Sequence, residues 1–297
     1  MERCLASRAN RSHARRLTAA AVGFALVAAL VAATTAGAAV TLGQLPATAT
    51  APQCLSTADY LEPSVTGGNL YIARQAGTIT SWSTRSSGAG ASYVFKIFRR
   101  TSDPDVFRAI VHAPPHLLTS GLNTVSVNIP VRPGDMIGLN ESGGLNSCTF
   151  TQLGDAVLIH GGNLADDASG LFTSVNDVRL NLSAVLVPSN DFTIGAITRD
   201  RKRGSATVTV NVSNPGVISI SGKGMKKGHD SKNVGVAGTV QFQIASAGAR
   251  KRKLHKTGKV TLTPTLTFFP AGGDPASTAF TLKLLRKRKT LPSVQTP

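Results

Sequence analysis

The side chains in this chain that could do chemistry are mainly lysines and arginines, which form four clusters in its C-terminal third. The clusters span 199–203, 223–232, 250–259 and 286–289. Cations at this density attract polyanions, and that attraction depends on salt and not on sequence. Lysine and arginine at strand ends also prevent edge-to-edge aggregation of sheets. The clusters therefore predict a role in solubility, with adhesion to polyanions as its functional extension.

The last two clusters supply the predicted polyanion-binding residues. These are Arg250, Lys251, Arg252, Lys253, Lys256, Arg286, Lys287, Arg288 and Lys289. No Phe, Trp or Tyr interrupts any cluster, whereas nucleic-acid modules usually place aromatic residues among the cations. If consecutive strands run antiparallel, we expect the first two clusters at one end of a sandwich and the last two at the other. Two basic poles in place of one groove argue against a specific nucleic-acid site.

Catalytic constellations are sparse in the sequence. The only close histidine pair, His112 and His116, encloses two prolines and has no acidic residue at helical spacing, so no metalloprotease motif is complete. A Gly-x-Ser-x-Gly elbow is absent. Paired carboxylates for glycoside hydrolysis could come from separate strands, but Glu62 and Glu141 are the only glutamates after the leader. We predict no catalytic residue, no cofactor and no enzymatic activity.

The sequence gives only weak indications of a metal site or a sugar-binding site. Asp103 with Asp105, and 166–167 with 176–177, could offer oxygens to calcium, but neither set follows an EF-hand pattern, and we expect no metal site. Sugar-binding faces usually present several Trp or Tyr, and this chain has one Trp and three Tyr. Trp82 alternates with Thr80 and Thr78, which favours a core position. Glycan binding near Trp82 stays as an alternative hypothesis.

The N-terminus predicts export. Arginines at 8, 11, 15 and 16 precede an uncharged apolar run over 17–33, and Ala36-Gly37-Ala38 follows it. This pattern is typical of a secretory signal cleaved after Ala38, and an uncleaved membrane anchor is the alternative. The adjacent arginines leave the general and the twin-arginine routes open. We expect a secreted protein without a transmembrane segment in its mature form.

Export makes the cysteines informative. Cys4 leaves with the signal, so Cys54 and Cys148 remain as an even pair in an oxidising compartment. Such a pair predicts one disulfide. Closing a loop of this length would stabilise the fold by about 4 to 5 kcal/mol through the entropy of the unfolded chain. No Cys-x-x-Cys exists to form a zinc site.

The charge changes sharply along the chain. Residues 39–190 contain 8 Lys or Arg and 10 Asp or Glu, a balance of −2, whereas residues 191–297 contain 19 and 4, a balance of +15. The step predicts a domain boundary near Val187-Pro188-Ser189. The segment 39–53 is rich in Pro, Ala and Thr and has no periodicity, which indicates a flexible lead.

Both halves show the period-two pattern of strands and no helical stripe. In the first half the pattern covers 78–82, 93–98, 107–111, 123–131, 136–139, 156–159 and 179–187; in the second it covers 208–212, 218–220, 240–244, 260–268 and 280–284. Pro264 inside one run indicates an edge or a bulge. About six strands in about 100 residues is typical of an immunoglobulin-like sandwich.

Short motifs resemble known modules. GVISISGKG (216–224), LHKTGKV (254–260) and TFFPAGG (267–273) are similar to an immunoglobulin-like module of secreted actinobacterial surface proteins. GTITSW (77–82) and IPVRPGDMIG (129–138) are similar to a jelly-roll-like module often found ahead of it. The resemblance implies an all-β surface protein and transfers no catalytic residue.

These observations combine into one prediction. The domains are a signal peptide at 1–38, a lead at 39–53, a jelly-roll-like β-sandwich at 54–188, a basic immunoglobulin-like β-sandwich at 189–290 and a tail at 291–297. The protein is a non-catalytic binding or scaffolding protein of the cell envelope, and its basic domain contacts anionic cell-wall or extracellular polymers. A glycan-binding accessory module is the alternative, and an extracellular enzyme ranks third.

Overall fold

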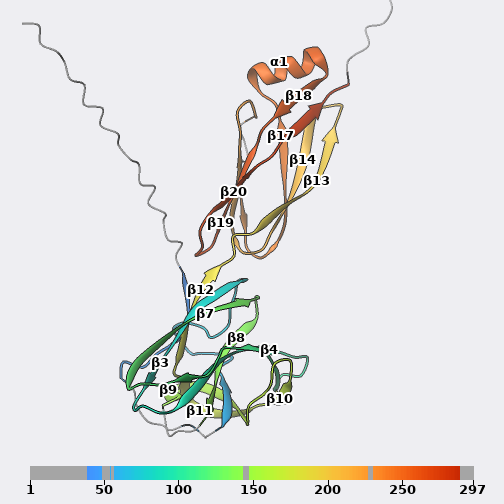
Figure 1. Cartoon of the computed structure of the whole chain (residues 1–297). Coiled ribbons are helices and arrows are strands. Elements are labelled where there is room, and N and C mark those ends of the chain that lie inside the picture. Colours follow the sequence, from blue (N-terminus) through green and yellow to red (C-terminus); the bar gives the residue numbers. More distant parts are fainter. Residues whose placement is uncertain (1–38, 49–53, 55–56, 143–146, 227–229, 288–297) are drawn as a thin grey trace, which may run out of the picture. The chain divides into compact units, whose positions relative to one another are not determined.

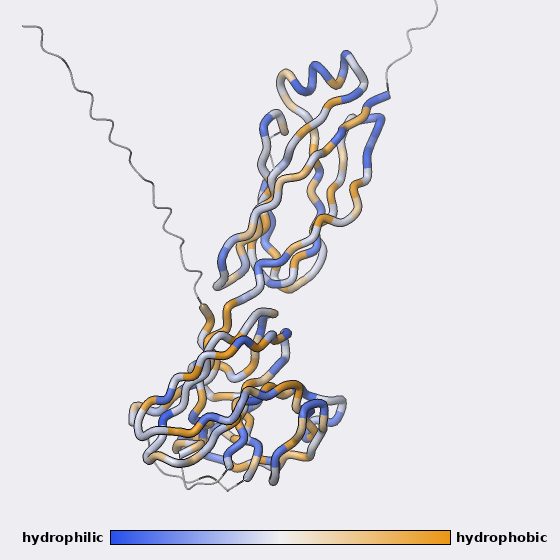
Figure 2. Tube along the Cα trace, viewed as in Figure 1, coloured by the Kyte–Doolittle hydropathy of each residue, from blue (hydrophilic) through white to orange (hydrophobic). Residues whose placement is uncertain are grey.

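The computed structural model describes residues 39–48, 54, 57–142, 147–226 and 230–287 (Figure 1). The predicted signal peptide and the predicted tail lie outside these residues, as do Arg288 and Lys289. The described part is almost entirely β-structure, which confirms the predicted all-β class. Hydrophobic residues recur along the strands of both halves (Figure 2).

The first half is a sandwich of two antiparallel sheets. One has the order β1-β12-β3-β7 and the other β10-β5-β4-β8-β2-β9-β11, with β6 paired to β4. The strands are β1 (Val40–Gln44), β2 (Ala58–Leu61), β3 (Gly77–Ser86), β4 (Ser92–Arg100), β5 (Val106–His112), β6 (His116–Leu117), β7 (Gly121–Val131), β8 (Asp135–Ser142), β9 (Thr149–Gly161), β10 (Ser169–Leu171), β11 (Thr173–Leu180) and β12 (Leu182–Pro188).

Strand pairing identifies the first sandwich as a jelly roll. β1 pairs with β12, β2 with β8, β3 with β7, and β4 with β5. These nested pairs are those of one long antiparallel ribbon wound into two sheets, which is the jelly-roll arrangement. The antiparallel pair β9–β11 extends the second sheet beyond β2. The core contains Trp82, Phe95 and Leu139, all wholly buried.

The second half is a smaller sandwich of three and four strands. β13 (Phe192–Asp200), β14 (Ser205–Val212) and β17 (Gly238–Ala245) form one sheet, and β16 (Ser231–Val234), β15 (Gly216–Ser221), β19 (Thr265–Pro270) and β20 (Ala276–Ala279) form the other. β18 (Lys259–Leu262) pairs with β21 (Leu282–Leu285). Pro264 lies between β18 and β19, which belong to different sheets, so the run 260–268, predicted as one strand with an edge or a bulge at Pro264, is two strands. Two facing antiparallel sheets of this size are typical of immunoglobulin-like folds.

The structure corrects two sequence predictions. Val40–Gln44, assigned to a flexible lead, is the edge strand β1, in which Leu42 is buried and faces Ala184 of β12. The connection after β17, expected to be non-helical, is the helix α1 (Gly248–Thr257). Its Ala, Arg, Lys and Leu residues favour helix, but Leu254 is its one buried residue, so no apolar stripe marks it. No helix in the described segments is long and apolar enough to cross a membrane.

Candidate polyanion-binding surface

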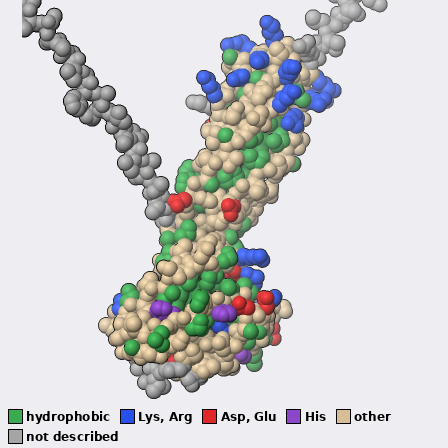
Figure 3. Space-filling model, viewed as in Figure 1, with side chains coloured by type: hydrophobic (Ala, Val, Ile, Leu, Met, Phe, Trp, Pro, Cys, Tyr) green, Lys and Arg blue, Asp and Glu red, His purple; other side chains and the backbone are tan. Residues whose placement is uncertain are grey.

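The four basic clusters meet at one end of the second sandwich (Figure 3). Lys287 N donates to Arg201 O over 2.8 Å, Arg286 N donates to Gly258 O over 2.8 Å, and Ala247 N donates to Gly224 O over 2.7 Å. These main-chain bonds join the β13–β14 turn, α1, the β15–β16 connection and the segment after β21. We call the described residues of the four clusters the basic tip. The predicted separation into two poles is therefore wrong.

A missed strand explains the error. The sequence pattern passes directly from 218–220 to 240–244, but the short strand β16 (Ser231–Val234) pairs with β15 between them. Each additional antiparallel strand returns the chain to the opposite end of the sandwich. With β16 included, two strands separate the second cluster from the third, so these clusters share an end. β16 is polar and has no buried residue, which left no period-two signal.

A single apolar anchor holds α1 at the tip. Leu254 is buried and lies against Gly204, where an added Cβ would be 2.8 Å from Leu254 Cδ2 and 3.4 Å from Arg286 Cβ. Gly258 ends the helix with a φ of 73°, and its N–H donates to Leu254 O, a left-handed cap that glycine adopts readily. Five other positions of α1 carry exposed cations, which are residues 250–253 and Lys256.

The orientation of α1 favours anions at its start. Its first turn has no acidic residue, and Arg250 and Lys251 stand there instead. The N-terminal end of a helix carries partial positive charge, and acidic groups usually compensate it. Cations at this end are locally unfavourable and strengthen the attraction for an anionic ligand. Residues that are unfavourable for the stability of their own helix are expected where a surface serves binding.

Acidic residues hardly offset the charge of the tip. The described parts of the four clusters contain fifteen Lys or Arg residues and two acidic residues, Asp200 and Asp230. Asp200 accepts hydrogen bonds from the main-chain N–H groups of Arg203 and Lys202 at 3.0 and 2.9 Å. These bonds hold the pKa of Asp200 below its usual value despite partial desolvation. Its negative charge therefore already accepts hydrogen bonds within the β13–β14 turn.

Most of the predicted binding residues lie together on the tip. Arg250 packs against Gly224, where an added Cβ would be 2.5 Å from its Cγ. Lys251, Arg252, His255 and Lys256 line a shallow hollow on α1. The sequence prediction omitted Arg201, Lys202, Arg203, Lys223, Lys226 and His255, which share this end of the sandwich. A correct strand count was the signal that could have found them.

The first sandwich accounts for the other candidates. Cys54 and Cys148 form the predicted disulfide, with their Cα atoms 5.7 Å apart. Trp82 is wholly buried and stacks on Phe95 with ring centroids 5.9 Å apart, so it cannot stack on a sugar and the proposed glycan site there is wrong. His116 meets Trp82 edge to face.

The candidate calcium and histidine residues have other partners. His112 Nδ1 lies 2.7 Å from Asp166 Oδ1, and Arg108 pairs with Asp167 at 2.7 Å. Across the described ranges, the single group of three possible metal ligands is Cys54, Glu141 and Cys148. Its two cysteines are bonded to each other, which removes their thiolates as ligands.

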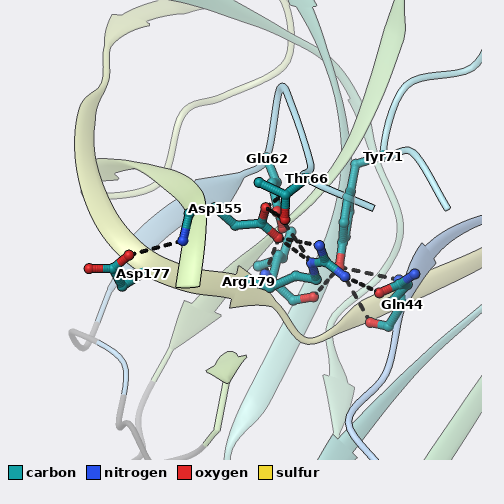
Figure 4. Close-up of polar contacts among 9 residues, drawn as sticks. Gln44, Glu62, Thr66, Tyr71, Asp155, Asp177 and Arg179 are labelled. Atoms are coloured by element: carbon teal, nitrogen blue, oxygen red, sulfur yellow. Dashed lines mark hydrogen bonds and ion pairs between the residues drawn. The ribbon is translucent and has the colours of Figure 1, made fainter. Parts of the chain in front are cut away.

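Two buried carboxylates share one arginine in the first sandwich (Figure 4). Arg179 of β11 hydrogen-bonds to Asp155 of β9, and its Nε lies 3.8 Å from Glu62 Oε1. Thr66 donates to Asp155 Oδ1 from its N–H at 2.6 Å and from its hydroxyl at 2.7 Å. Leu180 N donates to Glu62 Oε2 at 2.8 Å.

The same arginine reaches β1. Arg179 Nη1 donates to Gln44 Oε1, and the hydroxyl of Tyr71 donates to Leu180 O. Glu62, Asp155, Arg179 and Tyr71 are all buried. Because the guanidinium hydrogen bonds are directed at protein groups on two strands, β9 and β1, the chemistry of this cluster is that of an internal brace.

Burial separates the protonation states of the two carboxylates. Burial, with a smaller contribution from the charge of Asp155, raises the pKa of Glu62 to about 8, against the lowering effects of the Leu180 hydrogen bond and Arg179. Burial would also raise the pKa of Asp155, but the hydrogen bonds from Thr66 and Arg179 hold it below its usual value. At neutral pH the cluster therefore contains an ionised Asp155–Arg179 pair and a protonated Glu62.

A second buried pair lies beneath the β9–β10 connection. Lys96 Nζ lies 2.7 Å from Asp59 Oδ1, 2.6 Å from Asn163 Oδ1 and 2.7 Å from Leu164 O. An ammonium group has three N–H donors, and these three acceptors match them. Lys96 is therefore fully engaged in holding this connection against the sheet.

Comparisons with known proteins add little to this geometry. No family model matches the chain, and no curated protein matches its sequence. Among solved structures, the chain is similar to a GH2 β-galacturonidase from Eisenbergiella tayi bound to glycerol, at 10% identity and a TM-score of 0.21 over 82% of this chain. The form bound to galacturonate gives 11% identity and a TM-score of 0.20 over 82%. The chain spans 43% and 44% of those two chains, and likeness at this level carries no functional argument.

Proposed function

We propose that this protein is an exported, non-catalytic binding protein whose basic tip holds linear polyanions at or near the cell envelope. The observation that carries the proposal is the convergence of four separate basic clusters on one end of one sandwich (Figure 3). A purely solubilising role would be served by cations spread over strand ends at both poles. Concentration at a single end instead creates a strong local positive potential.

The composition of the tip defines the type of binding. It contains no Phe, Trp or Tyr in the described segments, so bases and sugar rings have no stacking platform there. Leu254, the one apolar side chain that α1 could insert into a bilayer, is buried in the sandwich. The ligand is therefore recognised by its charge, in water, without regard to sequence.

Export rests on two observations. The N-terminal 38 residues have the charge, apolar run and small-residue step of a cleaved signal, and the Cys54–Cys148 disulfide suits an oxidising compartment. The expected mature protein begins at Ala39. Intact mass of protein recovered from culture medium tests this, and a protein that keeps its first 38 residues in the membrane fraction would contradict it.

The binding proposal is tested by salt titration. The affinity of the mature chain for fluorescein-labelled duplex DNA and for long-chain polyphosphate should be measured by anisotropy from low to high salt. We expect the logarithm of the DNA affinity to fall linearly with the logarithm of the salt concentration, with a slope of about −0.9 for each phosphate neutralised. Binding that does not change with salt would reject the electrostatic proposal.

Two double variants of equal charge locate the site. Arg252→Gln with Lys256→Gln removes two exposed cations from the outer face of α1, and we expect the salt slope to become shallower by about 2 and binding at low salt to weaken roughly tenfold. Arg74→Gln with Arg132→Gln removes two exposed cations from the first sandwich. Equal losses in the two variants would show that net charge, and not the tip, determines binding.

A further inference from the structure

His255 occupies a distinctive position within the tip. It lies one helical turn after Lys251 on α1, in the hollow that Arg252 and Lys256 also line. Arg286, from the segment after β21, makes a hydrogen bond between its Nη1 and His255 Nε2. A guanidinium group can only donate. The imidazole nitrogen must therefore accept, which requires Nε2 to be unprotonated and the ring neutral.

The charges that act on His255 are positive. Partial desolvation, followed by the charges of Arg286 and Lys251, lowers the pKa of His255 below its usual value. The carboxylate in the adjacent β13–β14 turn, Asp200, is bonded to the main-chain N–H groups of Lys202 and Arg203. In the ligand-free tip, protonation of His255 would therefore add a cation among cations and break its hydrogen bond with Arg286.

An anion in the hollow reverses both effects. A phosphate group attracts the protonated ring, and once Nε2 carries a proton it no longer accepts from Arg286. The guanidinium is then free to donate two parallel hydrogen bonds to phosphate oxygens, its strongest mode of anion binding. Each phosphate of a polymer has two non-bridging oxygens with several lone pairs, and the next phosphate along the polymer adds more, so that Arg286, Lys251 and His255 can all donate to the same stretch of polymer.

We infer that the hollow on α1, with Arg286 beside it, is a phosphate-binding subsite that holds polymeric phosphate more tightly when His255 takes up a proton. This inference rests on the proposed function, because it concerns the regulation of the same tip. The linkage is reciprocal: phosphate binding promotes protonation of His255, and a fall in pH strengthens phosphate binding. An exported protein would then adhere more strongly in acidic surroundings.

The experiment compares affinities at two pH values. Binding of labelled duplex DNA, whose phosphates stay ionised throughout, is measured for the whole mature chain at constant ionic strength near pH 8 and near pH 5.5. We expect the dissociation constant to fall on acidification, by up to about tenfold if binding raises the pKa of His255 by one. His255→Gln should lose the strengthening at low pH, so that its dissociation constants near pH 8 and near pH 5.5 are close to each other.

The other histidine in the same half of the chain serves as the control. His229, which lies outside the described residues, and His255 are the two histidines after Asp191, so His229→Gln should keep the pH dependence. A pH dependence that survives in His255→Gln, or that disappears in His229→Gln, would overturn the inference. Parent protein that binds DNA equally at both pH values would also overturn it and leave the proposed function intact, whereas no binding at either pH would remove the proposed function itself.

Discussion

The buried carboxyl group of Glu62 is held protonated near neutral pH, because its pKa is raised from 4.5 to about 8. Arg179 has one guanidinium for two carboxylates, and Asp155 forms the direct hydrogen bonds with it. A second buried negative charge beside one cation would lack compensation. Protonation of Glu62 removes this second negative charge, and Glu62 Oε2 still accepts the hydrogen bond from Leu180 N.

This protonation state predicts how stability depends on pH. The pKa of Glu62 is higher in the folded than in the unfolded chain, so its contribution is fully present below about pH 4.5 and is lost as the pH rises through 8. Glu62→Gln stays neutral and keeps an acceptor for Leu180 N. Near pH 9 it should exceed the parent in free energy of unfolding by about 2 to 4 kcal/mol, and near pH 5 the two should be close.

Urea unfolding followed by Trp82 fluorescence measures this effect. Trp82 is the single tryptophan of the chain and lies in the core of the first sandwich, so it reports on that sandwich alone. Asp105→Asn, which removes an exposed carboxylate, is the matched control and should keep the pH dependence of the parent. A parent-like pH dependence in Glu62→Gln would show that Glu62 is ionised in the folded protein.

At the scale of elements, the sequence predicted strands where packing imposes alternation. β14 and β17 were found because Val208, Val210, Phe242 and Ile244 face one core. β1 and β16 are short edge strands paired with β12 and β15, and Leu42 is the one buried hydrophobic residue between them, so they show little alternation in the sequence. The position of the basic tip could not be predicted, because it depended on the number of strands and β16 was missing from that number.

The docking of α1 gives an element-scale prediction. Gly204 has a φ of 72°, and a methyl group there would press on Leu254. Gly204→Ala should therefore lower the free energy of unfolding of the second sandwich by about 1 to 3 kcal/mol, and it should weaken DNA binding by displacing α1. Differential scanning calorimetry and anisotropy measure the two effects.

A second glycine in the same sandwich provides the control for that substitution. An added Cβ at Gly195 would have its nearest neighbour at 3.6 Å, an ordinary contact, and its φ is not positive. Gly195→Ala should therefore change both stability and binding little. If Gly204→Ala and Gly195→Ala behave alike, the close approach of Leu254 to the β13–β14 turn is not what holds the helix.

At the scale of the whole molecule, the change in net charge near residue 190 coincides with the boundary between separate hydrophobic cores. Residues 39–190 carry a balance of −2 and residues 191–297 a balance of +15. No described sheet combines strands from before residue 190 with strands from after it, and the buried residues of the two halves form separate clusters. The disulfide, Trp82 and all three tyrosines belong to the first half. We therefore propose that the halves unfold as independent units and that the polyanion acts on one of them.

A polyanion should then stabilise the second sandwich alone. Ligand present at about 100 times its dissociation constant stabilises a folded unit by about 2.7 kcal/mol, which raises the transition temperature of a domain of this size by about 10 °C or more. Calorimetry of the whole chain should show two transitions, of which polyphosphate shifts one. The midpoint followed by Trp82 fluorescence should stay unchanged with polyphosphate and fall when a reductant opens the Cys54–Cys148 bond. A single transition, or a Trp82 midpoint that rises with polyphosphate, would show that the two sandwiches form one cooperative unit.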